Sequence, residues 1–279
     1  LVGDQRQLRP MVERSVQKGL LEEFGEEGKE LARSDFERAF DSTYGQRNAM
    51  VLDEQYRMTP TISDLVSDIF YKPHGVELKP SPDRKADATF QNLPSELSTP
   101  VVWFDTKKMG HANEKARNDG RDIWNDAEIR TVISLLHRLA AEDSLFNELA
   151  KTGEPQIGVI CMYSEQKRRI VREWSQQPLS ETFKQLVTID TVDAYQGKEN
   201  AIVILSLVRA NREIITGHVG HANRCNVAMS RAKERLFIVG NSAMWSNPKC
   251  KSPLRTVLTA VMGMKTTEGS LLDAEALRS

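Results

Sequence analysis

Short apolar runs separated by stretches of helical spacing constrain the fold of this chain more than any other feature. The longest run, 201–208, shows no regular alternation of apolar and polar residues, so it suits a strand that is buried on both faces. Similar runs lie at 157–161, 187–189 and 236–239. Strands of this kind that alternate with helices are typical of a parallel sheet covered by helices on both faces. We therefore expect an α/β fold.

Helical periodicity predicts the elements between these strands. Asn125 followed by Glu128 resembles a capping box and predicts a helix start. Within 11–48 the helical spacing is broken by glycines, but Phe36 and Phe40 stand at i, i+4. Further helices are expected at 60–71, 164–175, 223–232 and 253–262. The other expectations are a strand end at the start of the chain, strands at 49–52 and 101–104, an irregular connector at 72–100, a polar loop at 106–124 and a frayed tail after 263.

The composition excludes several classes of protein. A formal net charge of −1 argues against a protein that coats nucleic acid, so any such contact must come from a local basic patch. The three cysteines are far apart and odd in number, which argues against a disulfide framework or zinc module and favours a reducing compartment. No apolar run approaches the roughly 18 residues that span a bilayer, and the first residues lack the pattern of a signal peptide. We expect a cytoplasmic or nuclear protein with no membrane partner.

Four segments carry polar groups suited to a site. Each places polar side chains at an edge of the sheet, where parallel α/β folds bind ligands. Arg57 and Arg231 are the obvious anion ligands, because guanidinium keeps its charge and can bind phosphate in a bidentate manner. Two arginines that reach a γ-phosphate across a domain interface would stabilise the charge developing in phosphoryl transfer. The segments are Gly-Asp-x-x-Gln-Leu at 3–8, Gln-Tyr-Arg-Met at 55–58, Thr-Val-Asp-Ala-Tyr-Gln-Gly-Lys-Glu at 191–199 and Asn-Val-Ala-Met-Ser-Arg-Ala at 226–232.

In this order the segments resemble motifs III, IV, V and VI of superfamily 1 helicases, specifically the up-frameshift-like branch. The likeness covers nearly the whole chain and is weakest at 72–100 and after 263. It implies the second motor domain of such a helicase: a RecA-like, P-loop-NTPase-type parallel sheet without its own Walker A motif. The domain boundaries implied are 1–10 for the end of the first RecA-like domain, 11–48 for a helical connector, 49–262 for the second RecA-like domain and 263–279 for a C-terminal tail.

The resemblance also implies a role for individual residues. Gln7 would couple the γ-phosphate to strand movement, while Arg57 and Arg231 would contact that phosphate. Tyr56 would stack on the base of ATP, and Gly197 and Glu199 would hold its sugar-phosphate side. The residues expected along the nucleic-acid backbone are Tyr163, Gln166, Thr191 and Val192. The family usually has Thr-Pro before the tyrosine, whereas this chain has Cys161-Met162, which weakens the expectation for that loop.

The phosphate cradle of an ATPase does not occur in the sequence. A P-loop needs Gly-x-x-x-x-Gly-Lys followed by Ser or Thr, but Gly28-Lys29 and Gly197-Lys198 are each followed by Glu. We therefore expect ATP with Mg²⁺ to bind between this domain and a first RecA-like domain that carries the Mg²⁺ ligands. The chain begins as though just after those elements, and by itself it is expected to be inactive.

Simpler interpretations stand beside these. Asp53-Glu54 imitates a Walker B pair, but its position after Gly-Asp-x-x-Gln-Leu is wrong for that role. His218, His221 and Cys225 offer too few ligands for a metal site, so none is expected. The cluster 167–169 is either a solvated face or part of the nucleic-acid path. The four tryptophans are interpreted as packing residues, and either arginine alone could form a surface salt bridge.

Two functional hypotheses follow. The first is an ATP-driven helicase domain that acts on nucleic acid. The sequence alone decides neither the nucleic acid nor the polarity, but the resemblance favours RNA over DNA and movement from 5′ to 3′. The second is a non-catalytic interaction module, or pseudo-helicase fragment, that binds nucleic acid or protein without ATP turnover. The presence or absence of coding sequence for a P-loop upstream of Leu1 distinguishes them.

Overall fold

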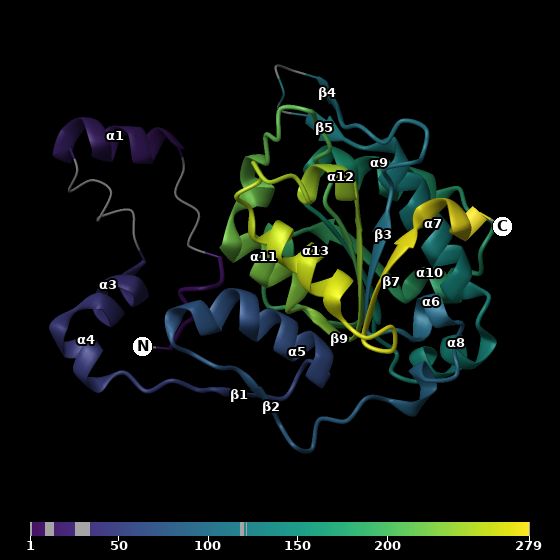
Figure 1. The fold of residues 1–279 in the computed structure, drawn as a ribbon, viewed down its shortest axis with the longest axis horizontal. Coiled ribbons are helices and arrows are strands. Elements are labelled where there is room, and N and C mark those ends of the chain that lie inside the picture. Colours follow the sequence, from purple (N-terminus) through teal and green to yellow (C-terminus); the bar gives the residue numbers. More distant parts are fainter. Residues whose placement is uncertain (1, 9–13, 26–33, 118–119, 121, 279) are drawn as a thin grey trace.

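A six-stranded, wholly parallel sheet organises the chain in the computed structural model (Figure 1). The structure describes residues 2–8, 14–25, 34–117, 120 and 122–278. In order across the sheet the strands are β10 (Gly269–Asp273), β3 (Val101–Asp105), β9 (Ala232–Gly240), β8 (Asn200–Ser206), β6 (Ile157–Cys161) and β7 (Val187–Thr191). The expected α/β fold is confirmed.

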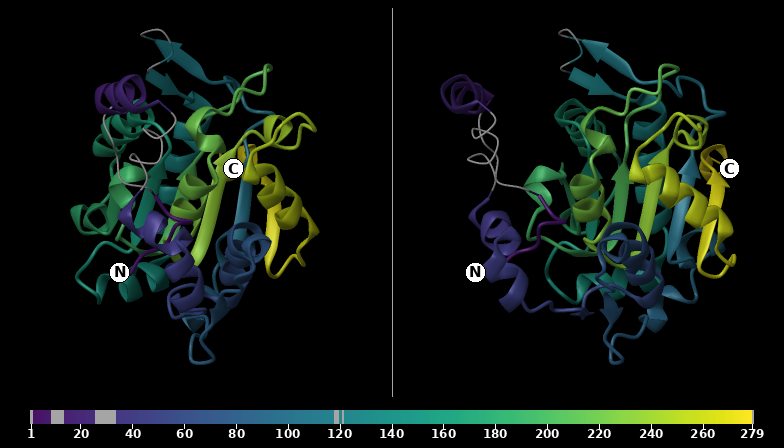
Figure 2. Two further views of the ribbon diagram at one scale, coloured as in Figure 1. Left: turned by 90° about the vertical axis from the view of Figure 1, so that its left-hand side faces the viewer. Right: turned by 60° about the vertical axis from the view of Figure 1, so that its left-hand side comes forward.

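Helices cover both faces of the sheet (Figure 2). Successive residues of a strand point to opposite faces, so Trp103 enters one apolar core and Phe104 the other. The first core is closed by α5 (Pro60–Val66), α11 (Ala222–Met229), α12 (Ser242–Trp245) and α13 (Pro253–Gly263). The second is closed by α6 (Ser95–Ser98), α7 (Asp126–Ala140), α8 (Asp143–Ala150), α9 (Ser164–Ser175) and α10 (Glu181–Gln185). Burial on both faces explains why the strands read as apolar runs.

Most expected elements of the second half are confirmed. Helix α9 has the expected bounds, and β6 matches its apolar run residue for residue. Helix α7 starts after Asn125, whose Oδ1 accepts from the backbone N–H of Glu128 at 3.2 Å. The capping box is only half formed, because the Glu128 carboxylate accepts from Ser206 and Val208 instead of turning back to the cap.

Three expectations for the chain after residue 48 were wrong. Residues 49–52 form no strand and are exposed, with Met50 88% accessible. The stretch 106–124 contains an antiparallel pair, β4 (Lys115–Arg117) and β5 (Asp122–Trp124). The tail after 263 is not frayed, because β10 adds to the edge of the sheet beside β3. Strand β4 is exposed and β10 is mostly half-buried, so neither carries the apolar run that predicts a strand buried on both faces.

The described residues before Tyr56 lie beside the six-stranded sheet and contribute no strand to it (Figure 1). As expected for the connector, they contain helices, with the rings of Phe36 and Phe40 stacked at 6.0 Å. Residues 2–8 form no strand, contrary to expectation. The helices are α1 (Arg14–Phe24), α3 (Asp35–Asp41) and α4 (Thr43–Asn48), followed by the short parallel pair β1 (Glu54–Gln55) and β2 (Lys79–Pro80).

Helix α5 continues into a single π-helical turn, η1 (Ser67–Tyr71). Together they form the expected helix at 60–71, whose apolar side chains face the first core. The wider π turn re-aims the last side chains. In the part of the chain that is described, no helix has the length and apolar character needed to cross a bilayer.

Candidate nucleotide-binding site

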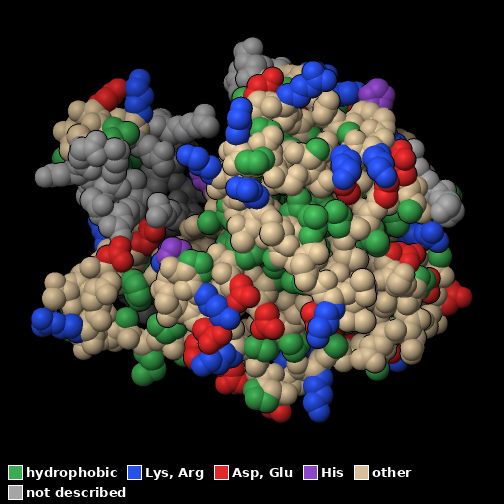
Figure 3. Space-filling view, in the orientation of Figure 1, with side chains coloured by type: hydrophobic (Ala, Val, Ile, Leu, Met, Phe, Trp, Pro, Cys, Tyr) green, Lys and Arg blue, Asp and Glu red, His purple; other side chains and the backbone are tan. Residues whose placement is uncertain are grey.

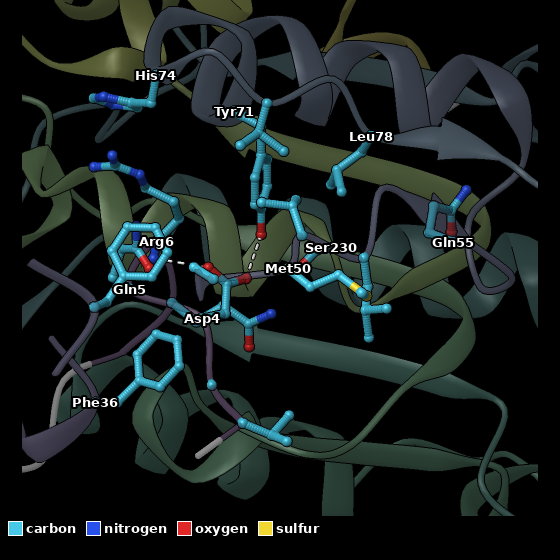
Figure 4. A pocket seen from close by; sticks show the side chains of 18 of the residues that line it. Asp4, Gln5, Arg6, Phe36, Met50, Gln55, Tyr71, His74, Leu78 and Ser230 are labelled. Carbon is cyan, nitrogen blue, oxygen red and sulfur yellow. Dashed lines mark hydrogen bonds between the residues drawn. The ribbon is translucent and has the colours of Figure 1, made fainter. Parts of the chain in front are cut away.

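A cavity of ≈ 980 Å³ lies between residues 2–7 and the segment that leads from α4 into α5 (Figure 4). Its walls come from residues 2–7, from α3 and α4, from 49–58 and from the end of α5 with η1. Glu199 and Ser230 close it on the side of the sheet. Strands β8 and β9 begin beside the cavity, because Glu199 directly precedes β8 and Ser230 lies two residues before β9. The cavity therefore sits at the amino edge of the sheet.

Arg231 lies just behind this wall, at the junction of α11 and β9. It is 2% exposed, and its Nε donates to the backbone oxygen of Val227 at 3.0 Å. Its Nη2 lies 3.1 Å from Ser230 Oγ and 3.4 Å from Gln7 Oε1. Among the described residues no carboxylate pairs with it. Burial, and then the nearby charge of Arg57, lower the pKa of Arg231 to about 10.

Arg57 also contacts Ser230, but it comes from the segment between β1 and α5. Its side chain is 31% exposed and pairs with Glu199, and its Nη1 donates to the backbone oxygen of Ser230 at 3.2 Å. Its own backbone oxygen accepts from Arg84 Nε at 2.8 Å. Ser230 thus contacts both guanidinium groups, although 173 residues separate it from Arg57.

Glu199 is the counter-ion on this wall. It accepts from Arg57 and lies 2.8 Å from Lys233 Nζ. Burial raises its pKa, but the bonds and charges of Lys233 and Arg57 outweigh burial and lower the pKa to about 2. Tyr56 lines the cavity at 68% exposure, and Gly197 adopts φ +85°, a conformation that suits glycine. Of the six residues predicted for the nucleotide, Gln7, Tyr56, Arg57 and Glu199 line the cavity. Arg231 lies behind its wall, and Gly197 is not among the lining residues.

The donor set suits an anion. Arg235 provides the comparison, because it is equally buried but makes bonds of 3.0, 2.7 and 2.7 Å to backbone oxygens. The bonds of Arg231 run from 3.0 to 3.5 Å. A guanidinium held loosely beside another positive charge fits a phosphate, which accepts several charge-assisted bonds.

The residues predicted for nucleic acid lie at the other edge of the sheet. Tyr163 follows β6, and its ring centroid lies 4.2 Å from that of His218 with the two rings tilted by 41°. Thr191 ends β7. The side chains of Gln166 and Val192 are 0% exposed. Gln166 accepts from the Asn125 backbone at 2.8 Å and donates to Ser206 at 2.9 Å, so its side chain holds α7 and β8.

The charged surface is mixed on the face drawn in Figure 3, where basic and acidic side chains are interspersed over the lower half. The basic cluster at 167–169 is paired: Lys167 lies 2.7 Å from Asp190, and Arg168 and Arg169 each lie 2.7 Å from Glu165. A phosphate backbone would have to compete with these carboxylates.

The residues for which the sequence offered simpler interpretations have ordinary structural partners. Asp53 stands on exposed coil and lies 3.2 Å from Lys79. His218 bonds to the Met162 backbone oxygen, and Cys225 Sγ donates to Val219. In the described residues, no three His, Cys, Asp or Glu side chains gather as a metal ion requires. The tryptophans are buried packing residues, as interpreted: Trp103, Trp124, Trp174 and Trp245.

Sequence reasoning missed three residues that hold the N-terminal segment, namely Tyr71, Asn223 and Asn226. Asn226 lay within a quoted motif but received no role. It also missed Glu128, whose pKa burial raises to about 8. A motif or a capping pattern can contain such a residue, as it does Asn226 and Glu128, but it does not show which backbone groups the side chain holds.

Comparisons with known proteins identify the family of the chain. A family model described as an AAA domain matches residues 31–243. The chain is 27% identical to DNA polymerase alpha-associated DNA helicase A of Saccharomyces cerevisiae, over 86% of this chain and 34% of that protein. It is 30% identical to regulator of nonsense transcripts 1 of Caenorhabditis elegans, over 68% of this chain and 17% of that protein. It is 29% identical to ATP-dependent helicase NAM7 of Saccharomyces cerevisiae, over 86% of this chain and 22% of that protein.

The chain spans about a third or less of the length of these relatives. The family model covers most of the chain, however, and includes three of the four motif segments. The chain belongs to the AAA-domain family, as the C-terminal motor domain of an up-frameshift-like superfamily 1 helicase.

Proposed function

We propose that this domain completes an ATP site whose P-loop and Mg²⁺ ligands lie on a first RecA-like domain, and that Arg57 and Arg231 act there as arginine fingers. The observation that supports this best is that both guanidinium groups bond to Ser230, one at its backbone oxygen and one at its hydroxyl. Two positive charges held this close favour a bound anion. A terminal phosphate would satisfy both, and its charge would be neutralised as the phosphoryl group transfers.

The neighbouring residues fit the remaining parts of a nucleotide. The exposed ring of Tyr56 is available to stack on a base, and the backbone at Gly197 has no Cβ to block approach. Glu199 would accept from the sugar and neutralise Arg57 before ATP arrives. Gln7, beside Arg231, would report the state of the γ-phosphate to the N-terminal segment.

Nucleic acid, with RNA favoured over DNA, would cross the carboxyl edge of the sheet. Tyr163 and Thr191 would contact its backbone there. Gln166 and Val192 are 0% exposed as whole residues, so these two would support this edge from below instead of touching nucleic acid. Opening and closing of the cleft between the two motor domains would then move nucleic acid along this edge.

The test is nucleic-acid-stimulated ATPase of the intact protein, with RNA and DNA strands compared. We expect turnover that rises with RNA and falls to background in the Arg57→Ala, Arg231→Ala double variant. The exposed Arg172→Ala variant is the control and should retain turnover. Nucleic-acid binding without any turnover in the wild-type protein would support the interaction module instead.

A further inference from the structure

We propose that Tyr71, Asn223 and Asn226 form a cradle that holds residues 4–7 on this domain and so sets the position of Gln7 beside Arg231. These are positioning residues, since they act through the segment they hold. The role of Gln7 rests on the function proposed above, but docking of the segment can be measured without ATP.

Asp4 is the first anchor of the segment. Tyr71 Oη donates to its Oδ2 at 2.6 Å, and the backbone N–H of Arg6 donates to its Oδ1 at 2.8 Å (Figure 4). Tyr71 is 7% exposed at the end of η1, where the π turn aims it into the cavity. Burial and the charge of Asp4 raise the pKa of Tyr71, so its hydroxyl stays a donor. A hydrogen bond to a carboxylate is one of the stronger kinds.

Two asparagines of α11 hold the backbone that follows. Asn226 Nδ2 donates to the Arg6 oxygen at 2.9 Å and to Tyr71 Oη at 3.0 Å. Asn223 Nδ2 donates to the oxygens of Gln5 at 3.1 Å and Gln7 at 2.6 Å. Asn226 is fully buried. The amide donors of both residues are therefore committed to the segment and its anchor.

The cradle is complementary to what it holds. Its hydroxyl and amide groups act as donors, and the segment offers one carboxylate and three backbone oxygens. The same helix, α11, leads directly to Ser230 and Arg231. One rigid element thus holds the backbone of Gln7 and ends at the guanidinium that its side chain meets at 3.4 Å. Loss of the cradle would separate the two.

The first experiment uses the chain itself and measures hydrogen exchange of the Arg6 and Gln7 amides, which bond to Asp4. Tyr71→Phe should speed their exchange about tenfold, as expected for loss of a charge-assisted hydrogen bond. Tyr195→Phe is the matched control, because Tyr195 is also buried and its hydroxyl donates to Asn200 at 2.7 Å. It should leave these two amides unchanged.

A double-mutant cycle then tests the hydrogen bond between Tyr71 and Asp4. Asp4→Asn should match Tyr71→Phe, and the double variant should exchange no faster than either single one. Unchanged exchange in Tyr71→Phe, or full additivity in the cycle, would overturn the cradle.

The second experiment measures ATPase of the intact protein carrying Tyr71→Phe or Asn223→Ala. We expect kcat to fall about tenfold while KM for ATP stays within twofold, since the variants displace Gln7 and leave the base and sugar contacts in place. Faster exchange with unchanged kcat would overturn the positioning role. If docking is lost in Tyr71→Phe but Arg231→Ala turns over normally, the proposed ATP site fails and the cradle stands.

Discussion

Arg57 and Arg231 meet at Ser230 from two regions built in different ways. Arg231 lies between α11 and β9, inside the sheet's own scaffold, and is 2% exposed. Arg57 follows the two-residue strand β1 on a stretch of exposed coil, and its side chain is 31% exposed. The first is fixed by the core, whereas the second is fixed by Glu199 and by Arg84 behind its backbone.

This difference implies a division of work between the two arginines. Arg231 has no carboxylate to release among the described residues, so a phosphate could bind it without breaking an ion pair. Arg57 must exchange Glu199 for the phosphate, and a surface ion pair is worth only about 0 to 1 kcal/mol. We infer that Arg231 is the preorganised charge and that Arg57 responds to the ligand.

The largest expected effect is that of Arg231→Ala on turnover. In the intact protein kcat should fall about 10³-fold or more, the usual contribution of an arginine finger. Nucleic-acid-stimulated ATPase measures it. Arg235→Ala is the matched control for a buried guanidinium, and kcat per folded molecule should stay within about threefold. Equal losses in both variants would show that Arg231 acts only through the fold.

Arg57→Ala should cost less, about 10²-fold in kcat, as for one preorganised donor to a transition state. Its melting temperature should not change, because the lost ion pair is partly exposed. Single-turnover ATPase and thermal unfolding check the two halves. A loss equal to that of Arg231→Ala would remove the distinction between the two regions.

Loss of Arg235 should lower the free energy of unfolding more than loss of Arg231, which is the reverse of their order in turnover. Arg231→Met also removes a desolvated charge and its repulsion by Arg57, so the free energy of unfolding should stay within about 1 kcal/mol. Arg235→Met leaves the buried oxygens of Leu97 and Phe90 without donors and should cost about 1 to 3 kcal/mol. Urea unfolding of the chain measures both. A larger loss of stability in Arg231→Met than in Arg235→Met would contradict the view that Arg231 is held ready for a ligand.

The smallest expected effect is that of Glu199→Gln, which keeps an acceptor but frees Arg57. KM for ATP should fall about threefold with kcat unchanged, and the gain should shrink at high salt. Because the pKa of Glu199 is lowered to about 2 from 4.5, its ion pairs contribute stability above about pH 4.5. That stability is lost as pH falls towards 2, and the variant should lose less of it. A rise in KM would show that the charge itself holds the nucleotide.

Much of the fold could be predicted because burial on both faces leaves a signal in the sequence. The run at 157–161 matches β6 for this reason. Helix 164–175 matches α9 because its buried residues Gln166, Ile170 and Trp174 recur every four positions. Strand β10 could not be predicted, since its residues are mostly half-buried and backbone pairing with β3 sets it. Strands β4 and β5 pair only with each other, and each has three residues, which is too short to show a periodic pattern.

In the site, too, some residues could be predicted from the sequence and others could not. Arg57 and Arg231 could be found because a motif fixes residue types at set spacing. Gln166 belonged to such a motif too, yet its side chain is buried between Asn125 and Ser206. A motif gives the residue type but not the direction of the side chain. Tyr71 could not be assigned, because only the π turn of η1 brings it to Asp4.

The most direct test of convergence on a terminal phosphate is the affinity of the intact protein for a non-hydrolysable ATP analogue relative to ADP. The wild-type protein should favour the analogue, and each single arginine variant should reduce that preference. The Arg57→Ala, Arg231→Ala double variant should bind both nucleotides equally, with its ADP affinity unchanged. A preference for the analogue that persists undiminished in the double variant would contradict the account.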